Sequence, residues 1–216
     1  LAQTILKDPE RIEVTPTSSV TKDVSQILYY VPKRNKIELC LHLLRNTIKG
    51  SILIFRRTKY GVDKLEQTLI KNGYKVETIH GNKSQNARQA ALENFKNKKV
   101  RVLVATDIAA RGIDIDQLSH VLNFELPNVP ETYVHRIGRT GRAKTEGEAF
   151  TLCKPEELPM VESIEKLLGN PLPRKFVDDF AYREAPESLV PNGAVVSKKR
   201  NRGFGKQVSF GSRRRR

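Results

Sequence analysis

Eight consecutive residues, 135–142 (HRIGRTGR), carry the most concentrated chemical functionality in this chain. Arginine recurs at every third position of the octet, as Arg136, Arg139 and Arg142, and no acidic residue interrupts them. A guanidinium is a planar fork of N–H donors that keeps its charge at any working pH, so it suits phosphate groups. Arginines at this spacing share one side of a helix. We therefore interpret the octet as a phosphate-binding segment rather than a solvated basic helix, which usually carries glutamate as well.

A second group of polar residues follows two short apolar runs. His80 and Gly81 come directly after residues 76–79, and Thr106 and Asp107 come after residues 100–105. Ligands bind beyond the carboxyl ends of the strands in open parallel sheets, so these positions are predicted to face a ligand. Asp107 itself is predicted to cap a short helical stretch, a common role for aspartate, and not to act as a catalyst.

The elements that must position these residues alternate between strand and helix patterns. Strand-like apolar runs lie at residues 24–31, 51–55, 76–79, 100–105, 118–124 and 148–153. Helical periodicity lies at residues 36–48, 62–69, 85–95, 131–137 and 156–168. This alternation predicts an α/β fold, with a parallel sheet covered by helices on both faces.

Composition narrows the class of protein. The chain has 216 residues, 38% of them hydrophobic and 29% charged, as in soluble globular proteins. No apolar run approaches the roughly 20 residues that span a bilayer, so no membrane association is expected. Cys40 and Cys153 lack metal-ligand spacing, which predicts no metal site and buried thiols in the reducing cytoplasm. Because the chain begins at Leu1 and its only methionine is Met160, we expect a segment upstream of it.

The charge is strongly positive and unevenly spread. The net charge is +15, and residues 197–216 contain nine lysines and arginines and no acid. A polyanion is the natural partner of such a chain. We predict that residues 188–216 form a disordered basic tail, and the alternative is a tail that only improves solubility.

Three stretches, in this order and spacing, closely resemble the second RecA-like domain of DEAD-box ATP-dependent RNA helicases. They are residues 84–88 (SQNAR), residues 105–114 (ATDIAARGID) and the octet itself. Residues 51–59 (SILIFRRTK) resemble motif IV of that family, and residues 1–12 resemble the segment that leaves its first domain. The tail is similar to those of bacterial members, the RhlE-like branch among them.

The resemblance implies a division of the chain. Residues 1–23 would be a lead-in or interdomain linker, and residues 24–170 the C-terminal RecA-like domain of the helicase. Residues 171–187 would be an extension that docks on or near the core through its aromatic residues, and residues 188–216 a tail that binds RNA.

The resemblance also implies a nucleotide-binding side. Arg139 and Arg142 match the arginines that reach the γ-phosphate of ATP across the domain cleft, and His135 matches a position that links the two domains. Gly112 and Asp114 match motif V residues beside the nucleotide, where a carboxylate suits the two ribose hydroxyls. The alternative role for Asp114 is a helix or turn cap.

An RNA-binding side is implied by other positions. Arg88 and Gln85 match the family's QxxR motif, in which the arginine contacts an RNA phosphate and the glutamine orients the segment. Thr106 and the backbone near Gly81 would hold neighbouring phosphates. Contacts to phosphates do not depend on sequence, which suits a helicase that acts on many RNAs.

Two further residues are expected to support the arginines. Phe55 resembles the motif IV aromatic that lies beneath them, and plain core packing is compatible with that role. Arg136 is predicted either to pair with an acid in the cleft or to contact the nucleotide.

Three departures from the family pattern stand out. Asn82 and Glu125 each replace an aspartate common in the family, and the Arg56-Arg57 pair is more basic than usual. The change at Asn82 puts in doubt the local hydrogen bond that the acid makes.

The chain lacks a glycine-rich loop ending in Gly-Lys-Thr and an Asp-Glu-Ala-Asp sequence. In the family, these phosphate-binding and magnesium-binding parts belong to the first domain, so ATP and Mg²⁺ would be held mainly there. The chain would then be the C-terminal half of an RNA helicase, and we expect no ATP hydrolysis from it alone. The alternatives are a non-enzymatic RNA-binding adaptor and a DNA-directed helicase or nuclease subunit with the same core.

Overall fold

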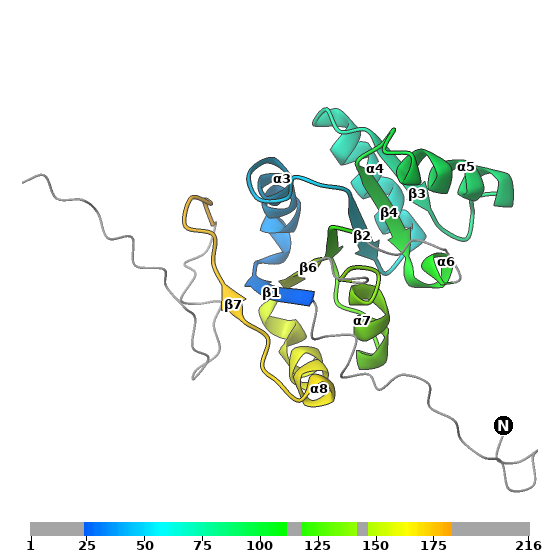
Figure 1. Cartoon of the computed structure of the whole chain (residues 1–216). Coiled ribbons are helices and arrows are strands. Elements are labelled where there is room, and N and C mark those ends of the chain that lie inside the picture. The colour runs from blue at the N-terminus through cyan, green and yellow to red at the C-terminus, as the bar shows by residue number, and fades with distance from the viewer. Residues whose placement is uncertain (1–23, 112–117, 142–146, 183–216) are drawn as a thin grey trace, which may run out of the picture.

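A computed structural model of the chain describes residues 24–111, 118–141 and 147–182. These residues form a seven-stranded sheet in the order β3-β4-β2-β5-β6-β1-β7, and all neighbouring strands are parallel (Figure 1). The strands are β1 (Val24–Tyr30), β2 (Ile52–Arg56), β3 (Val76–Ile79), β4 (Val102–Thr106), β5 (His120–Asn123), β6 (Gly147–Cys153) and β7 (Arg174–Lys175). The predicted parallel α/β architecture is confirmed. Strand β7 was not predicted, because two residues are too few to show a strand pattern.

Helices cover both faces of the sheet. They are α3 (Lys36–Asn46), α4 (Lys59–Lys71), α5 (Gln85–Lys96), α6 (Asp107–Ala110), α7 (Pro130–Ile137) and α8 (Leu158–Leu168), with short 3-10 turns η1 (Lys33–Asn35) and η2 (Pro155–Glu157) before α3 and α8. One core cluster joins the sheet to α3 and α4, and two others join it to α5 and α6 and to α7 and α8. Figure 1 shows α3 and α8 on opposite sides of the β1–β6 end of the sheet.

Side-chain alternation along β2 explains why its residues 52–55 are all apolar. Ile52 and Ile54 pack into the cluster beneath α3 and α4, whereas Leu53 and Phe55 pack into the cluster beneath α5 and α6. All four side chains are buried. A central parallel strand has no solvent face, so the period-two alternation of polar and apolar residues is lost.

Local signals fix where the helices begin and end. The Thr58 hydroxyl accepts a hydrogen bond from the Gly61 amide at the start of α4, and Ser84 does the same for the Ala87 amide at the start of α5. At the other end, Gly169 adopts a φ of 72° directly after α8. This left-handed conformation favours glycine, so α8 stops there.

The C-terminal extension packs on the domain as far as it is described. Phe180 lies against the α3 and α4 cluster, and Phe176 and Tyr182 lie against the α7 and α8 cluster. The rings of Phe180 and Tyr182 meet edge to face, with centroids 4.8 Å apart. Within the described ranges, no helix is long and apolar enough to cross a membrane.

Strand pairing brings the predicted site residues to one edge of the sheet. Arg56 at the end of β2 is in register with Thr106 at the end of β4, and Phe55 is in register with Asn123 at the end of β5. Parallel strands end on the same side, so the segments that follow them share this carboxyl edge. The loops after β2, β3, β4 and β5 are therefore neighbours.

Candidate functional site

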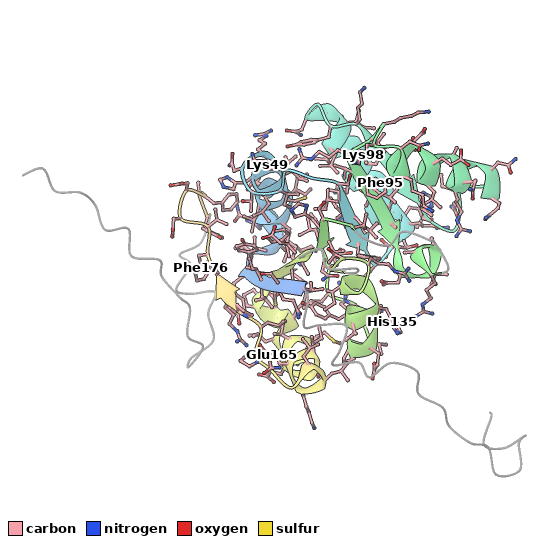
Figure 2. All side chains as sticks on the ribbon, viewed as in Figure 1. Lys49, Phe95, Lys98, His135, Glu165 and Phe176 are labelled. Carbon is pink, nitrogen blue, oxygen red and sulfur yellow. The ribbon has the colours of Figure 1, made fainter. Side chains whose placement is uncertain are left out.

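The described part of the octet lies on α7 and in the turn that follows it. His135 and Arg139 line a small hollow together with Thr132, one turn earlier on the helix, and with Arg111 after α6. Phe55, Asp107, Ala110 and Arg136 form the rest of its wall. His135 is exposed on α7 (Figure 2), and Arg139 is half-buried. The hollow thus presents an imidazole from α7 and cationic side chains from the segments after α6 and α7, at the carboxyl edge of the sheet.

Arg136 is the buried brace of this hollow. Only 1% of its surface is exposed, and its Nε and Nη2 donate to the two carboxylate oxygens of Asp107 at 2.6 and 2.8 Å. Its Nη1 donates to Asn123 Oδ1 at 3.0 Å and to the Glu125 carbonyl at 2.7 Å. The guanidinium also lies 5.0 Å from the Phe55 ring centroid. Of the two predicted roles for Arg136, the structure shows the internal ion pair.

The role predicted for Asp107 is wrong. Thr106 occupies the cap position of α6 and makes no side-chain capping bond, and Asp107 is the first residue of the helix. The Asp107 carboxylate is bound by Arg136 from α7 instead. A bidentate bond to a buried guanidinium is stronger than a cap to a one-turn helix, which explains why the side chain turns inward.

The backbone of Arg139 is held at both of its polar groups. Its amide donates to the Arg136 carbonyl at 3.2 Å, and its carbonyl accepts from the Leu118 amide at 3.1 Å. The next residue, Thr140, bridges to Leu118 and donates its hydroxyl to the Leu118 carbonyl. A Cβ at Gly147 would lie 2.4 Å from the Gly141 nitrogen, so only glycine permits this close approach. Arg139 is thus presented from a fixed turn.

The predicted RNA-binding residues lie along the same edge, beside β3 and β4. Arg88 donates to Gln85 Oε1 at 3.1 Å and to the Ala109 carbonyl at 3.1 Å, which ties α5 to α6. The structure thus shows Gln85 bonded to Arg88, and the RNA-binding role of both residues stays a prediction. Gly81 is exposed, and nothing lies within 4 Å of where its Cβ would be, so its backbone is accessible. Gly81 follows β3, Thr106 ends β4, and Arg88 lies in the first turn of α5, which its bond to Ala109 joins to α6 after β4.

The three departures from the family pattern have local explanations. Asn82 Oδ1 accepts a hydrogen bond from Lys59 Nζ at 3.0 Å, so an amide oxygen serves where an acid is common. Glu125 pairs with Arg56 through both oxygens, at 3.1 and 3.2 Å, and accepts from the Arg57 amide at 2.9 Å. The extra methylene of Glu125 and the extra charge of Arg56 therefore belong to one interaction.

Neither this pairing nor a second buried cation, Lys36, was predicted from the sequence. Lys36, only 4% exposed, donates to the carbonyls of Phe124 and Leu152 and to Glu157. Burial lowers the pKa of Lys36, and the Glu157 charge opposes that shift. Its partners lie far away in sequence, so the helical pattern around Lys36 gave no signal of this contact.

Glu125→Gln is expected to reduce the stability of the fold in a pH-dependent way. Burial alone would raise the pKa of Glu125, but the Arg57 amide and the charges of Arg56, Arg57 and Lys36 hold it below 4.5. This contribution to stability is therefore present above pH 4.5 and is lost as the pH falls through the folded-state pKa. We expect the variant to lose about 1–3 kcal/mol at neutral pH.

Urea unfolding at neutral pH and at several acidic pH values measures this effect. The difference between wild type and Glu125→Gln should shrink below pH 4.5. Glu162→Gln, at an exposed position of α8, serves as the control and should show a small difference at every pH. A Glu125→Gln difference that stays constant across the acid range would contradict the assignment.

Three predicted site residues, Gly112, Asp114 and Arg142, lie outside the described residues. Their roles in nucleotide binding remain predictions. Arg111, which directly precedes Gly112, lines the hollow. Gly141, which directly precedes Arg142, follows Arg139 and Thr140 in the turn after α7.

The chain matches the family model described as the helicase conserved C-terminal domain over residues 35–144. It is 41% identical over 166 residues to the DEAD-box ATP-dependent RNA helicase CshA of Bacillus subtilis, covering 77% of this chain and 34% of CshA. It is 39% identical to the DEAD-box ATP-dependent RNA helicase RhpA of Helicobacter pylori, with the same coverage of both chains. The chain thus spans about a third of the length of these curated relatives.

Solved structures agree with these matches. The E. coli DEAD-box protein SrmB, bound to regulator of ribonuclease activity A, is similar with a TM-score of 0.67 and 30% identity, over 81% of this chain and 97% of that one. S. cerevisiae Dbp5, bound to RNA and ADP BeF3, is similar with a TM-score of 0.71 and 28% identity, over 78% of this chain and 45% of that one. The fold, the motifs and these relatives agree: the chain belongs to the DEAD-box RNA helicases, as their C-terminal RecA-like domain.

Proposed function

We propose that this chain is the C-terminal half of an ATP-dependent RNA helicase, which unwinds RNA by closing on an N-terminal RecA-like domain. The observation that carries the proposal is the convergence of Arg139, His135 and the braced Arg136 on one hollow at the carboxyl edge of the sheet. The names of CshA and RhpA as ATP-dependent RNA helicases support it.

In this proposal, Arg139 and Arg142 act on the γ-phosphate of ATP. Negative charge on the transferring phosphoryl group is stabilised by an arginine that approaches from a second domain, and such arginines accelerate hydrolysis by about 10³–10⁵. Arg136 takes no part in this contact, because its donors are engaged by Asp107, Asn123 and the Glu125 carbonyl. It acts instead by holding α7, which carries His135 and leads into Arg139.

The RNA side of the proposal uses the neighbouring loops. Arg88, Thr106 and the backbone at Gly81 would hold successive phosphates of one strand. The bond from Arg88 to the Ala109 carbonyl positions the guanidinium beside the loop that starts at Thr106. A strand bent over this edge cannot stay in an A-form duplex, so its partner strand separates. Hydrolysis and phosphate release would then reopen the cleft.

ATP fits the chemistry of the described hollow, because its lining includes three arginines and a histidine. Arg111 and Arg139 supply fixed positive charge toward a triphosphate, whereas the charge of Arg136 is paired with Asp107. Among the described residues, no group of three acidic, histidine or cysteine side chains could hold a metal ion. As the family resemblance implies, we propose that Mg²⁺ is held mainly by the N-terminal domain.

Two other functions are compatible with the same fold. A non-enzymatic RNA-binding adaptor would use the basic edge but would leave the hollow around Arg139 without a ligand. A DNA-directed helicase would use both the basic edge and the hollow around Arg139. The proposal favours RNA, and the similarity to S. cerevisiae Dbp5, whose solved structure contains bound RNA, supports that choice.

The test compares this chain with the full-length protein that contains it. We expect the chain alone to show no ATP hydrolysis above background, and the full-length protein to be strongly stimulated by single-stranded RNA and weakly by DNA of the same sequence. RNA binding without ATP hydrolysis in the full-length protein would favour the adaptor. Equal stimulation by DNA would favour the DNA-directed enzyme.

A further inference from the structure

A second hollow lies at the carboxyl edge of the sheet, on the face covered by α3 and α4. It has a volume of about 320 Å³ and is distinct from the hollow that contains Arg139. Its walls come from the start of α3, the end of β2, the first turns of α4 and the end of β6. We refer to it as the basic groove, because six cationic side chains line it: Lys33, Lys36, Arg56, Arg57, Lys64 and Lys154.

The cations of the basic groove outnumber its acids. Glu125 forms an ion pair with Arg56, and Glu157 Oε2 lies 3.1 Å from Lys36 Nζ. Arg57 and Lys154 lie 3.8 Å from Glu157, beyond hydrogen-bonding distance. Lys33 and Lys64 are exposed, and no ion pair joins either of them to another described residue. The surplus charge attracts an anionic ligand.

The floor of the groove is rigid. The buried Lys36 ammonium joins the Phe124 carbonyl after β5 to the Leu152 carbonyl on β6, at 3.2 and 2.8 Å. The Lys36 ammonium also donates to Glu157, the last residue of η2, and so fixes the position of this turn. The Glu157 carboxylate lies beside Arg57 and Lys154. The groove is therefore formed before any ligand binds, which lowers the entropic cost of binding.

The groove continues the edge on which the proposed RNA contacts lie. Arg56 is in register with Thr106, and Arg57 follows it directly. Lys59, two residues further on, donates to Asn82 in the loop that carries Gly81. A strand held at Gly81 and Thr106 that continues along the carboxyl edge therefore passes Arg57 and reaches the groove.

An exposed aromatic residue, Tyr60, lies one helical turn before the groove residue Lys64 on α4. Tyr60 is 74% exposed, and Lys59 Nζ lies 5.2 Å from the centroid of its ring. Tyr60 and the groove residue Lys64 are four apart on α4, so they share one side of that helix. An exposed ring beside cations is the arrangement with which proteins stack the bases of single-stranded nucleic acids.

We propose that the basic groove is a second RNA-binding subsite, in which Lys33, Arg57, Lys64 and Lys154 hold backbone phosphates and Tyr60 stacks a base. This inference rests on the proposed function, because it extends the same RNA strand. An acidic protein segment would be attracted by the same charge. The exposed Tyr60 ring and the continuity with Gly81 and Thr106 favour a nucleic acid.

The experiment measures binding of fluorescein-labelled oligouridines of about 6 and about 14 nucleotides to this chain at several salt concentrations. Lys33→Ala/Lys64→Ala removes two groove charges, and Lys71→Ala/Lys75→Ala removes two exposed charges at the opposite edge of the sheet. We expect the groove variant to bind the longer RNA about fivefold or more weakly, with a salt slope smaller by about 1.4. The shorter RNA and the control variant should stay within about twofold of wild type.

Tyr60 is tested separately. Tyr60→Ala should weaken binding of the longer RNA about fivefold or more, and Tyr60→Phe should restore it, since stacking needs only the ring. RNA that contains 4-thiouridine should crosslink to Tyr60 on irradiation. Equal binding by Tyr60→Ala and Tyr60→Phe, with no crosslink at this residue, would contradict the stacking role.

Arg88→Ala separates this inference from the proposed function. This substitution should weaken binding of both the shorter and the longer RNA. A loss with Arg88→Ala but none with the groove variant would overturn the second subsite and leave the proposed function standing. A loss only with the groove variant would uphold the groove and contradict the RNA path proposed above. If the groove variant instead loses binding of a polyglutamate peptide while RNA binding is unchanged, the groove is a site for acidic protein, and the inference is wrong.

Discussion

Arg139→Ala is expected to lower the RNA-stimulated rate of ATP hydrolysis by about 10³-fold or more in the full-length protein. Arg139 lies at the hollow on a turn whose backbone is held by Leu118 and Arg136, so in the proposed mechanism its guanidinium would approach the nucleotide from a fixed turn. Removal of the side chain leaves the charge that develops on the phosphoryl group without this partner. Steady-state ATPase assays at saturating RNA measure the effect as a change in kcat.

Two controls isolate the role of Arg139. Arg34→Ala removes an exposed arginine from η1 and should leave kcat unchanged. Arg139→Lys keeps the charge but loses the planar fork, so most of the rate should still be lost. RNA affinity without nucleotide should be the same in all variants. A kcat for Arg139→Ala within about tenfold of wild type would exclude the arginine-finger role.

Arg136→Ala is expected to cost this chain about 3 kcal/mol of unfolding free energy. The substitution leaves the Asp107 carboxylate without its bidentate partner and also removes donors from Asn123 and the Glu125 carbonyl. The cost is placed at the lower end for a buried pair because the Asp107 side chain is 22% exposed and gains some solvent. Urea unfolding followed by circular dichroism measures the change.

A double-mutant cycle with Asp107→Asn tests the cause. If the ion pair dominates, Arg136→Ala should cost less in the Asp107→Asn background than in the wild type, and the coupling should exceed about 1 kcal/mol. Arg136→Lys should recover only part of the loss, since an ammonium cannot bond both carboxylate oxygens in the same plane. Additive losses would show that Arg136 acts through packing over Phe55 and not through Asp107.

The parts of the fold that the sequence predicted well are governed by local patterns. Residues 52–55 are buried on both faces, so a continuous apolar run identified β2. Ser84 and Thr58 cap their helices through bonds that span three residues, which a sequence window contains. The octet and the QxxR segment were also readable, because their residue types are close together along the chain.

The errors and omissions concern contacts between distant segments. Asp107 was expected to cap α6, because the window around it does not contain Arg136, its partner from α7. Lys36 was overlooked in an ordinary helix pattern, and its partner Glu157 is 121 residues away. Arg56 and Glu125 were each noticed as departures, and their opposite charges were the one signal that could have joined them.

Adjacent residues Thr106 and Asp107 join the two proposed ligand sites within a single peptide unit. Thr106 belongs to the proposed RNA contacts, and Asp107 holds Arg136 of α7. If occupation of one site favours one arrangement of this unit, the coupling free energy must be the same in both directions. Bound RNA would then raise the affinity for the nucleotide by the same factor as bound nucleotide raises the affinity for RNA. One coupling free energy, measurable by titration of either ligand, would therefore describe the connection between nucleotide binding and RNA binding.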